Sequence, residues 1–111
     1  DYFYFPKYLP VDFQVVEEES TKYDYFIRFE KADKYFCISQ RLNSSTKQTR
    51  IDTEYLDVSR IKIGGNLGFY AEDEEKRLIY IDMGNIAISI YGNIEKKEML
   101  QMANNMQLLE K

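Results

Sequence analysis

Apolar and polar side chains alternate with a period of two over most of residues 13–92. Successive side chains of a strand point to opposite faces of its sheet, so this period predicts strands. The expected strands are Phe13–Glu18, Tyr23–Glu30, Tyr35–Leu42, Tyr55–Ile63, Leu67–Ala71, Arg77–Met83 and Ile86–Tyr91. Short polar or glycine-containing turns separate most neighbours, so we expect consecutive antiparallel hairpins. The last two strands are largely apolar on both faces, which predicts a central position with both faces covered.

The hydrophobic period changes after residue 92. Apolar residues then recur at spacings of three and four, which predicts an amphipathic helix over residues 95–109. The apolar stripe comprises Met99, Met102, Ala103, Met106 and Leu109. Glu95 stands three residues before Glu98, the spacing of a capping box with Glu in place of Ser or Thr. We therefore expect an α+β fold, in which an antiparallel sheet of about six or seven strands is closed by one C-terminal amphipathic helix.

Residues 1–12 form an aromatic lead-in to the first strand. Pro6 and Pro10 exclude a helix there, so we expect an extended segment whose rings lie against the domain. An exposed aromatic patch that binds a ligand is the alternative. Two other surfaces are candidates for binding, the polar Asn43–Arg50 loop and the sheet face that the helix leaves uncovered. The candidate binding residues are Tyr2, Tyr4, Tyr23, Tyr25 and Tyr35.

Length and composition place the chain among single-domain globular proteins. Its 111 residues match the commonest domain size, so we expect residues 1–111 to share one core. Apolar residues make up 44% of the chain and aromatic residues 15%, which excludes a disordered chain. The net charge is −4, with no basic stripe that would neutralise a phosphate backbone, so nucleic acid is not an expected partner. No segment reaches the roughly 20 apolar residues that span a bilayer.

Few residue types suited to catalysis are available. The chain has no histidine, which removes the commonest general base and metal ligand. Its one cysteine, Cys37, lies in an alternating strand and is expected to be a buried apolar residue, so we expect no metal or cofactor. The 19 acidic residues leave a carboxylate-based hydrolase open, but most stand in turns or at water-facing positions, so we expect no enzyme. The acidic run Glu72–Glu75 is expected to be a solvated hairpin tip rather than a calcium loop.

A series of short motifs resembles a known family. The motifs are, in order, Tyr8-Leu9-Pro10 with Phe13, Ile38-Ser39-Gln40, Ile61-Lys62-Ile63-Gly64 with Gly68, Ile86–Gly92, Glu98-Met99-Leu100 and Met102-Ala103. In that order, and over nearly the whole chain, the sequence resembles the domain of unknown function 4367, found in envelope proteins of Gram-positive Firmicutes. Two positions depart from the family pattern, since Tyr80 stands where a Trp is usual and Glu95 where a Ser or Thr caps the helix.

The resemblance implies an extracytoplasmic domain of a membrane-anchored protein or lipoprotein. The chain starts at Asp1 without a methionine, so we expect the anchor in a preceding segment. The family defines no catalytic residues. The leading hypothesis is therefore a non-catalytic envelope domain that senses or binds a small ligand or a protein. The alternative is a structural module that self-associates through an exposed edge strand or the aromatic lead-in.

Overall fold

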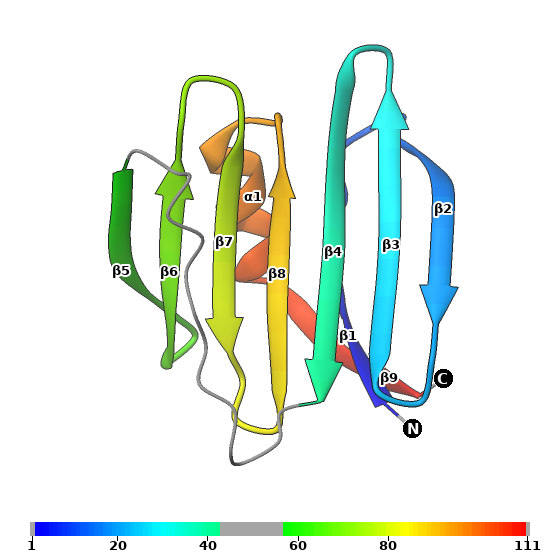
Figure 1. Cartoon of the computed structure of the whole chain (residues 1–111), viewed down its shortest axis with the longest axis vertical. Coiled ribbons are helices and arrows are strands. Elements are labelled where there is room, and N and C mark those ends of the chain that lie inside the picture. The colour runs from blue at the N-terminus through cyan, green and yellow to red at the C-terminus, as the bar shows by residue number, and fades with distance from the viewer. Residues whose placement is uncertain (1, 43–56, 111) are drawn as a thin grey trace.

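The computed structural model describes residues 2–42 and 57–110 of the chain. This part contains nine strands and one helix, and it confirms the α+β class (Figure 1). The elements are β1 (Tyr2–Pro6), β2 (Gln14–Ser20), β3 (Asp24–Lys31), β4 (Lys34–Leu42), β5 (Asp57–Ile63), β6 (Asn66–Glu72), β7 (Arg77–Asp82), β8 (Ile86–Gly92), α1 (Lys96–Ala103) and β9 (Met106–Glu110). The expected Asn43–Arg50 loop lies outside the described residues.

Seven strands form the main antiparallel sheet, in the order β2-β3-β4-β8-β7-β6-β5. Each half is a series of hairpins, as expected, and β4 pairs with β8 where the halves meet. The turn residues explain the tight connections, because Ala32, Gly64, Gly65 and Gly84 all have positive φ. The acidic run does form a hairpin tip, in which the Asp73 carboxylate accepts hydrogen bonds from the backbone N–H groups of Glu75 and Lys76.

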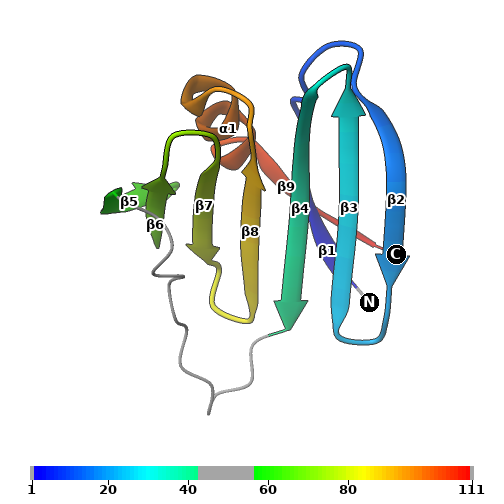
Figure 2. The same cartoon turned by 45° about the horizontal axis from the view of Figure 1, so that its top comes forward.

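A second layer covers one face of this sheet. Helix α1 lies over β7 and β8, and a two-stranded ribbon of β1 and β9 lies over β3 and β4 (Figures 1 and 2). The residues between the layers are aliphatic, aromatic or methionine, as the alternating pattern predicts. The largest fully buried side chains between the layers are Phe36, Ile38, Ile79, Ile81, Ile88, Ile90, Met99 and Met102. Cys37 is fully buried as well, as expected, but it lies on the other face of the sheet.

Strand β8 is the middle strand of the seven, which confirms the predicted central position of the last strand pair. Of the two faces expected to be covered, the described residues show cover by a helix on one, the face toward α1. Within residues 2–42 and 57–110, no helix or strand lies over the face opposite α1 (Figure 1). None of the helices in that part of the chain is long and apolar enough to cross a membrane.

The predicted helix over residues 95–109 is too long. It begins at Lys96, as the pattern indicates, but it ends at Ala103, after which Met106–Glu110 forms β9. The Asn104 and Asn105 side chains donate hydrogen bonds to the carbonyls of Leu100 and Gln101, at 2.8 and 2.6 Å, and so satisfy the end of the helix. The lead-in likewise contains a strand, because β9 pairs with Tyr2–Pro6. Pairing with β1, about a hundred residues earlier in the chain, therefore makes residues 106–110 a strand although their apolar spacing is helical.

Candidate functional site

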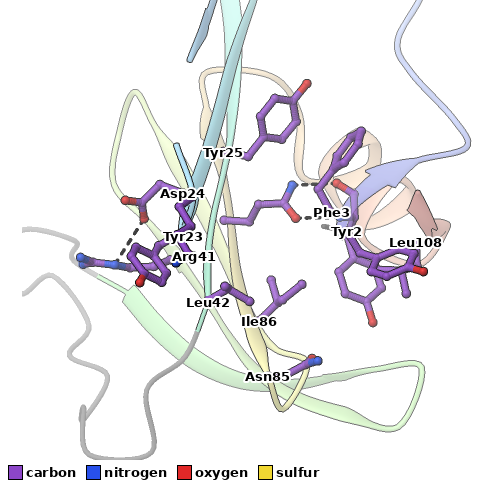
Figure 3. Close-up of a pocket in the computed structure, with 13 residues that line it drawn as sticks. Tyr2, Phe3, Tyr23, Asp24, Tyr25, Arg41, Leu42, Asn85, Ile86 and Leu108 are labelled. Atoms are coloured by element: carbon purple, nitrogen blue, oxygen red, sulfur yellow. Dashed lines mark hydrogen bonds and ion pairs between the residues drawn. The ribbon is translucent and has the colours of Figure 1, made fainter. Parts of the chain in front are cut away.

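A cleft of about 370 Å³ lies between the β1–β9 ribbon and the adjacent end of the main sheet (Figure 3). Its volume falls within the range of small-molecule binding sites in proteins. One wall is the ribbon, and the other is the sheet where β3 begins, β4 ends and β8 begins. The lining residues are Tyr2, Phe3, Tyr4, Lys22, Tyr23, Asp24, Tyr25, Gln40, Arg41, Leu42, Asn85, Ile86 and Leu108.

The ribbon wall is fixed to the sheet by a polar contact and by aromatic packing. The Gln40 side chain accepts a hydrogen bond from the Tyr4 N–H and donates one to the Tyr4 carbonyl, both at 2.7 Å. Gln40 is 4% exposed and is the one buried polar residue in the described core. Beside it, the Phe3 ring packs edge-on against Tyr25, with centroids 4.7 Å apart. The two walls of the cleft therefore keep a defined spacing.

The floor on the sheet side is formed by Tyr25, Leu42 and Ile86, which point toward the ribbon (Figure 3). The Tyr25 hydroxyl donates a hydrogen bond to the Glu18 carboxylate. Burial, this hydrogen bond and the negative charge of Glu18 together raise the pKa of Tyr25 well above its usual value. Tyr25 therefore stays protonated at physiological pH and serves as a wall of the cleft rather than as an acid or base.

The charged residues of the site lie at its rim. Asp24 and Arg41 point away from the ribbon and form an ion pair at 3.3 Å (Figure 3). Lys22 lies at 5.5 Å from the centroid of the Tyr23 ring. Because these charged groups lie at the rim, the inner cleft presents mainly aromatic surface and phenol hydroxyls. This chemistry suits an uncharged ligand with both apolar and hydroxyl or amide groups.

Four of the five tyrosines singled out from the sequence line this cleft. These are Tyr2, Tyr4, Tyr23 and Tyr25, of which Tyr23, at 56% exposed, lies at the rim beside Arg41 (Figure 3). Tyr35 does not join them. Its ring lies on the opposite face of the sheet, with the Arg28 guanidinium carbon 4.4 Å from its centroid. Ligand binding by these tyrosines stays a prediction.

Sequence reasoning missed the residues that complete the cleft. Gln40 carried a usable signal, because it is a polar residue in register with Phe36 and Ile38 on an apolar strand face. A polar side chain at such a position needs a hydrogen-bonding partner. Leu108 carried none, because its place in the cleft depends on the pairing of β9 with β1.

Comparison with known proteins supports the resemblance seen in the sequence. A family model described as "Domain of unknown function (DUF4367)" matches residues 4–106. No curated protein matches the chain. A crystal structure from Bacteroides thetaiotaomicron VPI-5482 is similar, with a TM-score of 0.51 and 15% sequence identity. The similarity covers 92% of this chain but 44% of that one, and at this identity it concerns the fold alone.

Proposed function

Since the chain belongs to the family of domains of unknown function described as DUF4367, we propose that it is a non-catalytic binding domain of the cell envelope. The proposed ligand site is the cleft between the ribbon and the sheet. The observation that carries the proposal is the pairing of two fixed, tyrosine-rich walls around about 370 Å³ of space. The extracytoplasmic location rests on the family resemblance.

The chemistry of the lining favours binding over catalysis. Hydrolysis of a glycosidic bond uses two carboxyl groups that flank the scissile bond. Among the described residues that line the cleft, Asp24 is the only carboxylate, and it is paired with Arg41. Nucleophilic catalysis needs a base beside the nucleophile, and the chain has no histidine to supply one.

The ligand class follows from the walls. Tyrosine combines a flat apolar ring with a hydroxyl that donates and accepts hydrogen bonds. Tyr2 and Tyr4 from the ribbon line the cleft together with Leu42 and Ile86 from the sheet. A soluble glycan or glycopeptide fragment of the cell wall matches this mixture of apolar faces and polar groups. Such a ligand is also available outside the membrane.

Thermal denaturation with a panel of ligands tests the proposal. Muropeptides, neutral oligosaccharides, unrelated short peptides and short-chain lipids are added in excess. A ligand that binds only the native state raises Tm, with about 2.7 kcal/mol of stabilisation at a hundred times its Kd. We expect muropeptides and neutral oligosaccharides to raise Tm and the other two classes to have no effect.

A matched pair of variants locates the site. Tyr2 is 58% exposed, so Tyr2→Ala leaves the fold intact while it removes one ring of the cleft. Leu67 is 66% exposed on β6 and is not a lining residue of the cleft, so Leu67→Ala serves as the control. The ligand-induced shift in Tm is expected to fall at least severalfold in Tyr2→Ala and to stay unchanged in Leu67→Ala. An equal shift in both variants, or no shift with any glycan fragment, would contradict the proposal.

A further inference from the structure

The face of the main sheet opposite α1 and the ribbon carries aromatic, aliphatic and small polar side chains across its middle. Strand register places side chains of this face in rows that run across the sheet. One row consists of Phe26, Ser39, Ser89, Tyr80 and Phe69, and the next of Arg28, Cys37, Tyr91, Leu78 and Ala71. We call this whole face of the seven-stranded sheet the open face. Within residues 2–42 and 57–110, no helix or strand covers it.

The two edges of the open face carry opposite charges. At the β2 edge, Glu17 pairs with Arg28 and Glu19 with Phe26, so both carboxylates lie on this face. At the β5 edge, Arg60 pairs with Phe69 and Lys62 with Leu67, which places both cations there. All four charged side chains are exposed. The two edges of the face therefore differ in charge, acidic along β2 and basic along β5, while Arg28 with Glu30 and Arg41 with Asp24 form ion pairs between them.

From this distribution we infer that the open face binds the open face of a second copy of the chain. Two sheets packed face to face lie about 10 Å apart and form a sandwich. When the twofold axis runs parallel to the strands, β2 of each copy lies over β5 of its partner. The acidic edge then meets the basic edge on both sides of the dimer. An axis perpendicular to the strands places β2 over β2 and is disfavoured by repulsion between like charges.

The size of the open face matches that of a stable interface. Seven strands about 4.8 Å apart, each about seven residues long at about 3.3 Å per residue, give a face of roughly 700–800 Å². A specific protein–protein interface of standard size buries about 800 Å² on each partner. Edge-to-edge pairing is less favourable, because the exposed β2 edge carries Glu17, Glu18 and Glu19 and a register shift between Val15 and Glu17.

This inference goes beyond the proposed ligand binding and uses the other face of the sheet. Its test is a pair of charge reversals measured by sedimentation equilibrium at low salt, where charge effects are strongest. The protein is expected to dimerise reversibly. The variants Glu17→Lys/Glu19→Lys and Arg60→Glu/Lys62→Glu each place like charges together and are expected to weaken dimerisation at least tenfold. An equimolar mixture of the two variants restores complementary edges and is expected to dimerise again.

A second pair of variants tests the apolar contact. Leu67→Asp introduces a charge on the open face, whereas Val11→Asp introduces the same charge at an exposed position outside the main sheet. Dimerisation is expected to weaken in Leu67→Asp and to persist in Val11→Asp. A protein that stays monomeric at about 0.5 mM overturns the inference, since a Kd weaker than 1 mM corresponds to less than about 4 kcal/mol of binding. Failure of the mixed variants to dimerise, or growth into open-ended polymers, overturns it as well.

Discussion

The side-chain amide of Gln40 binds both backbone polar groups of Tyr4, with the two hydrogen bonds each 2.7 Å long. Gln40 thereby occupies the place that a neighbouring strand would take beside β1. It belongs to β4 of the main sheet, so this single residue connects the two sheets of the fold. The connection also holds the ribbon wall of the cleft in position.

The variant Gln40→Leu tests this connection. Leucine has a similar volume but leaves the N–H and carbonyl of Tyr4 without their partner. An unsatisfied polar group costs about 1–3 kcal/mol, so we expect the free energy of unfolding to fall by about 2–3 kcal/mol. Urea denaturation measures the change. The control is Gln14→Leu at an exposed position of β2, which should change stability by less than about 0.5 kcal/mol. A loss in Gln40→Leu no larger than in the control would show that aromatic packing alone holds the ribbon.

The main sheet is the part of the fold that the sequence predicts well, because its strands follow a strict period of two. Phe36 and Ile38 face the core together, and the turns carry residues that accept positive φ. Each of these hairpins depends on residues close to one another in the sequence. The start of the helix is also predicted from local sequence, since the period changes at Glu95, the residue that precedes the helix.

The ribbon could not be predicted in this way, because its two strands come from opposite ends of the chain. Met106 and Leu109 continue the helical spacing of Met99 and Met102, so the local pattern does not distinguish a longer helix from a new strand. The pairing of Leu109 with Phe3 decides the outcome. The cleft could not be predicted from the sequence for the same reason, since one of its walls is the ribbon. The sequence indicates individual tyrosines as candidate binding residues, but only the tertiary structure shows which of them line one cleft.

The N-terminus of α1 offers a stabilising substitution. Glu95 is the N-cap residue and has the extended backbone of a cap, but its side chain makes no capping hydrogen bond. Aspartate keeps the charge and has the side-chain length that caps favour. We expect Glu95→Asp to raise the free energy of unfolding by about 0.5–1 kcal/mol, as measured by urea denaturation. The control Glu95→Ala supplies no cap and should give no gain. Equal stability of the aspartate and alanine variants would rule out a capping effect.

Gly92 is required by the close approach of β8 and β4. A Cβ atom at this position would overlap the Tyr35 carbonyl oxygen and lie 2.7 Å from the Phe36 Cα atom. Since these are backbone atoms, the strands must move apart, and we expect Gly92→Ala to cost about 2–3 kcal/mol or more. The comparison variant is Gly64→Ala, whose new Cβ meets no atom within 4 Å but whose φ is +58°. That substitution should cost about 1 kcal/mol from backbone strain alone. A smaller loss in Gly92→Ala than in Gly64→Ala would contradict the steric argument.

The stability of the domain should fall at alkaline pH, in part because of Tyr70. This side chain is 3% exposed and donates a hydrogen bond of 2.9 Å to the Glu72 carboxylate. Burial, reinforced by this hydrogen bond and by the negative charge of Glu72, raises the pKa of Tyr70 to about 12. The pKa of an unfolded tyrosine is about 10. Above pH 10 the unfolded chain therefore loses this proton, whereas the folded chain keeps it up to about pH 12.

Because the folded state binds this proton more tightly, the stabilisation is complete below about pH 10 and is lost as the pH rises toward 12. We expect Tyr70→Phe to make the decline in unfolding free energy between pH 10 and 12 shallower, by at most about 1.4 kcal/mol per pH unit. Urea denaturation at several pH values measures this slope. The variant also loses the hydrogen bond to Glu72, but this loss lowers the unfolding free energy at every pH and does not change the slope. Tyr91 provides a parallel test, since burial and the nearby Cys37 thiol raise its pKa to about 12 as well. Slopes that stay unchanged in both phenylalanine variants would show that other groups control the alkaline transition.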